Sequence, residues 1–180
     1  ANGVNPFCVS FDYGQRHKKE LYSAGQIAYY FGVTHHTLVF PKALFMGSSL
    51  TGVGEVPFAH WEDPVQQTTI VPNRNLVFLS IAATLAKQRG IEEVLFAAHA
   101  GDSMIYPDCR PDFIESANQT MKLACGIVVR APFLNMTKKD IVILGRSLQV
   151  PFHLTWSCYM GGESPCGQCG ACQERIEAGV

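Results

Sequence analysis

The sequence predicts an α/β fold in which helices cover both faces of a parallel sheet. Short, continuously apolar runs alternate along the chain with longer segments whose apolar residues recur at helical spacing. Such runs are typical of strands buried on both faces, and the amphipathic segments between them supply the covering helices. The chain has 180 residues, of which 47% are hydrophobic, so it is long enough to bury one sizeable core.

The predicted elements follow one another in order. A strand over residues 4–11 runs into the turn at Gly14, and a helix over 15–31 ends at Gly32. Further strands are predicted over residues 37–40, 94–98 and 127–129, and further helices over 76–85, 113–124 and up to 148. Thr137 and Asp140 resemble a capping box that opens the last helix. Residues 42–72 show no clear period, which fits either a lid or binding loop or a disordered segment.

Parallel sheets place their binding sites at the carboxyl ends of the strands. Residues 12–13, 72–75 and 99–110 would collect at that edge. His99, which follows a predicted strand, is a candidate for proton transfer.

The composition narrows the classes of binding partner and the cellular compartment that we expect for this protein. The formal net charge is −1, and the densest basic cluster, residues 16–19, is followed at once by Glu20, which argues weakly against direct nucleic-acid binding. No secretory leader opens the chain, and no apolar run approaches the ~20 residues of a membrane span. We therefore expect a cytoplasmic protein with no membrane partner.

Four of the seven cysteines are crowded near the C-terminal end of the chain. They are Cys158, Cys166, Cys169 and Cys172. Two-residue spacers let neighbouring thiolates reach one ion, so we predict a structural zinc site with four sulfur ligands. An iron–sulfur cluster is the rival interpretation, and free or disulfide-paired cysteines are the remaining one. We expect no open coordination position, and we expect the zinc to brace the C-terminal segment beside the active-site edge.

Four segments, read together, resemble one family. They are residues 11–17 (FDYGQRH), 71–75 (VPNRN), 106–110 (YPDCR) and 155–159 (TWSCY) with the downstream cysteines. Together they resemble the 7-cyano-7-deazaguanine (preQ0) synthases, which belong to the PP-loop ATP pyrophosphatases. That resemblance implies a Rossmann-like, adenine-nucleotide α-hydrolase-like fold. It also implies a zinc ion on the four cysteines named above.

The resemblance implies an enzyme that makes preQ0 from 7-carboxy-7-deazaguanine and ammonia. ATP, with Mg²⁺, is the co-substrate. The carboxylate is adenylated, ammonia displaces AMP to give an amide, and a second activation dehydrates the amide to a nitrile. The product feeds queuosine, archaeosine or deazaguanine bases in DNA. Relatives in this fold often pair, so a homodimer is one expectation.

Candidate site residues lie in the quoted motifs. Arg74 is expected to contact phosphate, with a solvated or capping arginine as the alternative, and Asn75 is a polar partner or a cap. Asp102, Tyr106, Asp108 and Arg110 could read the deazaguanine ring and its carboxylate, although Tyr106 to Asp108 also suits an ordinary turn. We assign Arg74, Asp102, Asp108 and Arg110 to catalysis. Phe11, Tyr13, Gln15, Asn75 and Tyr106 are assigned to ATP or substrate, with core packing an equal rival for Phe11. Cys109 is expected to be a packed residue.

One family motif is absent from the printed sequence. The pyrophosphate-binding loop, Ser-Gly-Gly-x-Asp-Ser, does not occur in it. We therefore expect residues 1–153 to form the nucleotide and substrate domain without its first strand, loop and helix, and residues 154–180 to form the zinc segment. If these 180 residues were the whole protein, we would expect no ATP-dependent turnover. A related nucleotide-activating protein that modifies a macromolecule, as in defence systems, and a non-catalytic zinc-bearing binding module are the alternative functions.

Overall fold

The computed structural model describes residues 5–52 and 54–180, which form two compact units. The first unit contains the described residues up to Val71 together with Arg146–Val180, and the second contains Pro72–Gly145. Each unit holds one parallel pair of strands with helices packed on it, so the predicted α/β class is confirmed. The strands described here pair two by two and do not form one continuous sheet. The predicted division into residues 1–153 and 154–180 stays a prediction.

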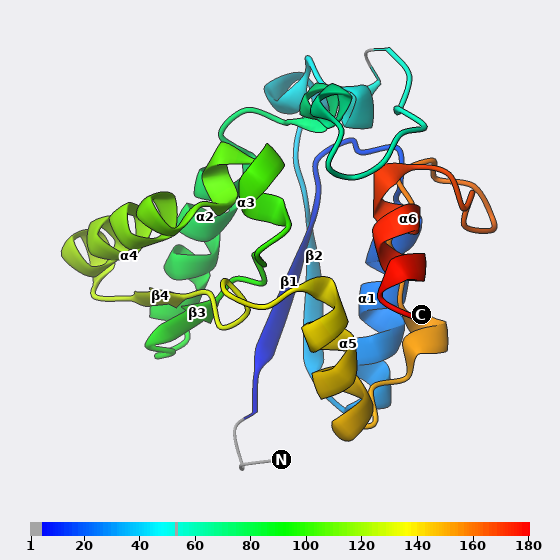
Figure 1. The fold of residues 1–180 in the computed structure, drawn as a ribbon. Coiled ribbons are helices and arrows are strands. Elements are labelled where there is room, and N and C mark those ends of the chain that lie inside the picture. Colours follow the sequence, from blue (N-terminus) through cyan, green and yellow to red (C-terminus); the bar gives the residue numbers. More distant parts are fainter. Residues whose placement is uncertain (1–4, 53) are drawn as a thin grey trace. The chain divides into compact units, whose positions relative to one another are not determined.

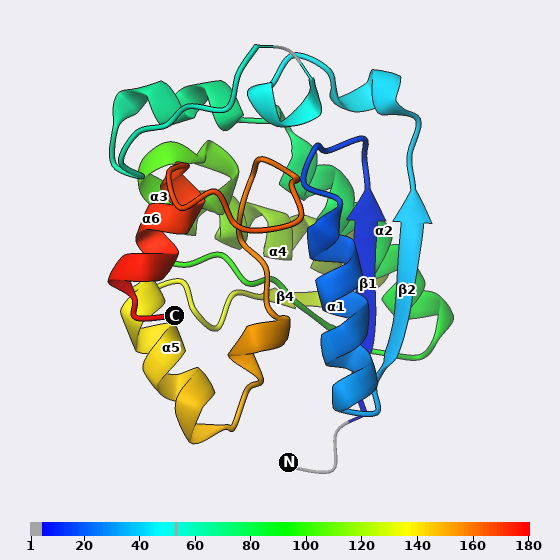
Figure 2. The ribbon, with the colours of Figure 1, turned by 90° about the vertical axis from the view of Figure 1, so that its right-hand side faces the viewer.

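The first unit is built on β1 (Phe7–Asp12) and β2 (Thr34–Val39), with α1 (Lys19–Tyr30) joining them. The strands are parallel, with Phe7 opposite Thr34 and Asp12 opposite Val39. Figure 2 shows α1 lying along both strands. The predicted elements are therefore present with shifted bounds, and Val4, the predicted first residue of β1, lies outside the described residues.

The turn between β1 and α1 explains why the helix begins at Lys19 and not at the predicted Gln15. Gly14 has φ 89°, a left-handed conformation that favours glycine. The Gln15 side chain accepts a hydrogen bond from Tyr13 N–H (2.9 Å) and donates one to the Phe11 carbonyl (2.9 Å). Because the side chain of Gln15 closes the turn, this residue cannot begin the helix.

The long segment between the strands of the first unit and α2 is packed. Its described residues include three short 3₁₀ helices, Lys42–Phe45, Ser49–Thr51 and Pro64–Thr69. Ser48, Leu50 and Thr69 are each only 1% exposed. Burial of this kind favours the interpretation of an ordered loop over that of a disordered one.

The second unit packs two long helices against a short strand pair. Its elements are α2 (Arg74–Gln88), β3 (Glu93–Leu95), α3 (Asp102–Ile105), the 3₁₀ turn Pro107–Cys109, α4 (Pro111–Cys125), β4 (Val128–Arg130) and most of α5 (Lys138–Ser147). Figure 1 shows α2 and α4 beside β3 and β4. The core contains Leu79, Ala83, Ala86, Ala117, Met121, Ile127 and Val129. Three alanines among these residues allow close approach of the two helices.

The remaining helix, α6 (Gly170–Glu177), belongs to the first unit, as does the 3₁₀ turn Phe152–Leu154. A helix after the last cysteine fits the sequence, but the periodicity gave no bounds for either element. Among the helices that the structure describes, none is both long and apolar enough to cross a membrane.

The capping box that opens α5 is present as predicted. Asp140 Oδ2 accepts hydrogen bonds from Thr137 N–H (2.9 Å) and from the Thr137 hydroxyl (2.6 Å), and Asp140 N–H donates to Thr137 Oγ1 (3.2 Å). The hydrogen bonds from the Thr137 hydroxyl and N–H hold the pKa of the Asp140 carboxyl below its usual value.

We expect Thr137→Ala to lower the free energy of unfolding by about 1 kcal/mol, the usual cost of losing a helix cap. Because the pKa of Asp140 is lower in the folded state, its contribution is present above about pH 4 and is lost as the pH falls through the folded value. The difference in free energy of unfolding between the wild type and Thr137→Ala should therefore be smaller at acid pH. Urea unfolding at pH 7 and pH 3 measures both effects, with Gln119→Ala, at an exposed position of α4, as the control. An equal deficit at both pH values would contradict the assignment.

Candidate active site and metal centre

Two of the quoted motifs meet at the start of α2. Asn75 N–H donates to Asp108 Oδ2 (3.0 Å), and the Asn75 side-chain amide donates to the Asp108 carbonyl (3.3 Å) and to Cys109 Sγ (3.3 Å). The N–H of Asn75 is one of those that a helix start leaves without a partner inside the helix, so Asp108 caps α2 from a distant segment. Asn73 enters the helix at φ 60°, a left-handed conformation that asparagine tolerates better than most residues.

Arg74 is held over the first turn of α2. Its Nε–H donates to Asn75 Oδ1 (3.1 Å), and its guanidinium carbon lies 5.9 Å from the centre of the Phe78 ring. A cation gains nothing from the positive end of the helix dipole, so helix stability does not account for an arginine at this position. Its charge and the neighbouring N–H groups suit a phosphate or carboxylate.

Asp102 and His99 form a second polar pair in the same unit. Asp102 Oδ2 accepts from His99 N–H (3.1 Å), and Asp102 Oδ1 lies 3.4 Å from His99 Nε2. His99 Nδ1 accepts from Gly101 N–H (3.1 Å), which assigns the ring proton to Nε2. The imidazole of His99 is buried beside the Asp102 carboxyl group.

The YPDCR motif folds around this pair. Tyr106 N–H donates to the Asp102 carbonyl (2.8 Å), and Arg110, which is exposed, donates from Nε to the Ser103 carbonyl (3.3 Å). Burial, together with the charges of Asp102 and Asp108, raises the pKa of the Cys109 thiol to about 12. A thiol of this kind stays protonated at neutral pH, which favours the packing role over a nucleophile.

The other three candidates, Phe11, Tyr13 and Gln15, lie in the first unit. The ring centroids of Phe11 and Phe40 are 5.9 Å apart, and Tyr13, only 3% exposed, packs edge-on against Phe45 at 5.5 Å. Gln15 closes the turn described above. All three side chains therefore have a structural role, and their contact with ATP or substrate stays a prediction.

The four cysteines come together as the spacing predicts. Their Sγ atoms all lie within 4.8 Å of one another, and Cys158, Cys169 and Cys172 are buried. Cys169 precedes α6 as its N-cap, and Cys172 lies in its first turn. Four sulfur atoms ~2.3 Å from a tetrahedral ion would be roughly 3.8 Å apart, so this donor set fits one metal ion with little movement.

Backbone N–H groups surround the sulfur atoms. Cys158 Sγ accepts from Met160 and Cys166 N–H (both 3.4 Å), and Cys166 Sγ accepts from Gln168 (3.4 Å) and Cys169 (3.3 Å). Burial opposes ionisation of Cys166, but these N–H groups outweigh it and lower the pKa of this thiol to about 7. Burial raises the pKa of Cys169 and Cys172. A bound cation would offset the cost of ionising them.

The cysteine segment packs on the β1–α1 turn of its own unit. The rings of Tyr159 and His17 are 5.3 Å apart, and Lys19 Nζ lies 5.0 Å from the centre of the Trp156 ring and 3.2 Å from Glu163 Oε2. The segment that could hold the metal thus supports the turn that carries Tyr13 and Gln15.

Sequence reasoning missed two links of this architecture. The contact between Asn75 and Asp108 joins motifs 33 residues apart. The contact of Trp61 with Glu177 spans 116 residues. No periodic pattern in the sequence predicts either contact, although Asn75 and Asp108 both lie within the quoted motifs.

A model of the family described as Queuosine biosynthesis protein QueC matches residues 2–179 of the chain. The chain belongs to the QueC family. A relative from Archaeoglobus fulgidus is 47% identical over an alignment of 181 residues that covers 98% of this chain and 76% of the relative. One from Marinomonas is 41% identical over 181 residues, covering 98% of this chain and 83% of the relative. One from Paracoccus denitrificans is 45% identical over 176 residues, covering 94% and 76%. Each of the three is named 7-cyano-7-deazaguanine synthase.

The packing of the cysteine segment on the β1–α1 turn can be tested at Gly161. Gly161 has φ 71°, and a Cβ there would lie 2.3 Å from the Arg16 carbonyl oxygen. We expect Gly161→Ala to lower the free energy of unfolding by about 1–3 kcal/mol because both the left-handed backbone and the close contact forbid a side chain. Gly162→Ala is the control, since its Cβ would meet the Ser164 carbonyl at an ordinary 3.6 Å. Equal stability of the two variants in thermal unfolding would refute the contact.

Proposed function

We propose that this protein converts 7-carboxy-7-deazaguanine and ammonia to 7-cyano-7-deazaguanine at the expense of ATP. Membership of the QueC family carries the proposal, together with the shared name of its relatives. A carboxylate is a poor electrophile, so its conversion to an amide needs a leaving group, which adenylation supplies with release of pyrophosphate. Ammonia then displaces AMP, and a second adenylation allows the amide oxygen to leave with AMP as the nitrile forms.

The geometry of the second unit supports roles for its motif residues. Arg74 brings a fixed cation to the N-terminus of α2, where a phosphate or carboxylate would also meet backbone N–H groups. Asp102 presents a carboxylate positioned by His99, which suits the ring N–H groups of a guanine-like base. Arg110 and Tyr106 lie in the same motif, while one Asp108 oxygen is already occupied by Asn75 N–H.

The metal is proposed to be zinc. Four thiols whose Sγ atoms lie within 4.8 Å of one another, three of them buried, suit a structural Zn²⁺ site with no position left for water. Such an ion would hold the C-terminal segment together and take no part in the adenylation steps.

The activity is tested by incubating the full-length protein with ATP, ammonia and 7-carboxy-7-deazaguanine, and detecting the nitrile and AMP by mass spectrometry. We expect Arg74→Ala to reduce kcat/KM by about 10²–10³, the usual cost of removing one donor to transition-state charge. Arg89→Ala, at the other end of α2, is the matched control. Absence of nitrile product from the unmodified protein would refute the proposed activity. A fully active Arg74→Ala variant would refute only the proposed role of Arg74.

The metal is tested by elemental analysis of the purified protein. We expect one zinc per chain, retained by Arg74→Ala and lost from Cys169→Ser, because a hydroxyl is a poor replacement for a buried thiolate ligand. Iron with inorganic sulfide in the protein would favour the rival cluster.

A further inference from the structure

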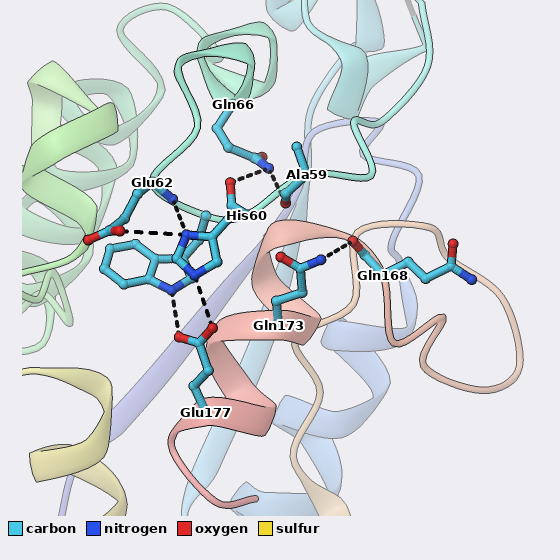
Figure 3. A network of polar contacts seen from close by, with 8 residues as sticks. Ala59, His60, Glu62, Gln66, Gln168, Gln173 and Glu177 are labelled. Carbon is cyan, nitrogen blue, oxygen red and sulfur yellow. Dashed lines mark hydrogen bonds and ion pairs between the residues drawn. The ribbon is translucent and has the colours of Figure 1, made fainter.

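The last turn of α6 holds residues 59–66, which we call the strap. Glu177 accepts two hydrogen bonds from it, from Trp61 Nε1 (2.9 Å) and from His60 Nε2 (3.0 Å). Figure 3 shows the carboxylate of Glu177 pointing up from α6 towards the His60 ring. An acidic side chain in the last turn of a helix is disfavoured by the helix dipole. The stability of α6 therefore does not explain Glu177, whereas the two donors of the strap do.

The strap also contacts the first turn of α6. The side-chain amide of Gln66, only 3% exposed, donates to the Ala59 carbonyl (2.9 Å) and the His60 carbonyl (3.3 Å), which closes the strap on itself. The same amide lies against the backbone of Gly170, where a Cβ would be 2.7 Å from Gln66 Nε2. The strap therefore contacts both ends of α6.

The position of α6 depends in turn on the cysteines. The helix has eight residues, too few to be stable alone in water. Its start is fixed by Cys169, whose carbonyl accepts from Cys172 N–H (2.9 Å) and Gln173 N–H (3.0 Å). The Gln173 side chain reaches back to the Gln168 carbonyl (3.2 Å), which ties the helix to the turn between two of the thiols.

From these contacts we propose that the strap is a latch whose closure is coupled to metal binding. A metal ion on the four thiols fixes the start of α6, α6 presents Glu177, and Glu177 holds the strap closed through Trp61 and His60. The Glu177 and His60 side chains are 51% and 44% exposed, so water competes for these bonds and the latch can open without unfolding the unit. Loss of the metal or of the carboxylate releases the strap.

Hydrogen exchange of the full-length, zinc-loaded protein tests the latch. Backbone amides of Asp63, Gln66 and Ile70 are hydrogen-bonded within or next to the strap and report its opening. We expect Glu177→Ala to speed their exchange about fivefold to tenfold, as loss of two hydrogen bonds to one exposed carboxylate would give. The zinc content should be unchanged. Glu55→Ala, which removes an exposed acid from the same long segment, is the matched control.

Removal of zinc with a chelator should speed exchange of the same amides, and Glu177→Ala should add nothing to that effect because the latch is already open. Unchanged exchange in zinc-loaded Glu177→Ala would overturn the proposal. So would a zinc-free protein whose strap stays protected, or effects of the two changes that simply add.

The zinc affinity is a second measurement of the coupling between metal binding and strap closure. It tests the coupling even if removal of zinc unfolds the protein. Coupled equilibria are reciprocal, so the factor by which zinc favours the closed strap is also the factor by which the closed strap favours zinc. We expect Glu177→Ala to weaken zinc binding several-fold in competition with a colorimetric chelator, whereas Glu55→Ala leaves it unchanged. Equal zinc affinities of the wild type and Glu177→Ala would refute the coupling.

Discussion

Four thiols gathered by residues 158–172 are the constraint on which the first unit depends. The residues around them do not form a large apolar core, and they include a helix of only eight residues. Hydrogen bonds from N–H groups to sulfur order these residues, and the proposed metal ion would add the constraint of ligand geometry. The cysteine segment packs against the β1–α1 turn, through Tyr159 and Gly161, and against Lys19 at the start of α1. The four thiols therefore also help to position β1, which lies more than a hundred residues earlier in the chain.

The second unit is stabilised mainly by an apolar core. Leu79, Met121 and Ile127 form an apolar cluster, and the alanines between them bring α2 and α4 close together. The polar motifs lie at the ends of these helices and are bonded chiefly to one another, as with Asn75 and Asp108 or His99 and Asp102. A rigid helical base with a connected polar rim suits the positioning of a charged substrate, because little reorganisation is left for the moment of reaction.

How far the sequence could predict this structure depended on how local each feature is. The cysteine spacing and the Thr137–Asp140 box were predicted correctly because each is encoded within a few residues. The start of α1 was predicted four residues early, since the side chain of Gln15 serves the turn, which helical periodicity cannot reveal. The strand predicted over residues 94–98 is Glu93–Leu95 in the structure. Phe96 N–H still donates to the Arg130 carbonyl (2.8 Å), and the pairing ends there because β4 ends at Arg130. The links from Asp108 to Asn75 and from Glu177 to Trp61 join distant segments, and no local pattern encodes them.

The first unit is discontinuous in sequence, and this has a consequence for biosynthesis. Its two parts are separated by the whole of the second unit, Pro72–Gly145, which is one continuous stretch. A ribosome therefore delivers every residue of the second unit before it delivers Cys158, so the second unit can fold while the first is still being made. The four thiols therefore come together only after the second unit has been made, and the proposed metal ion would bind to a chain whose second unit can already be folded.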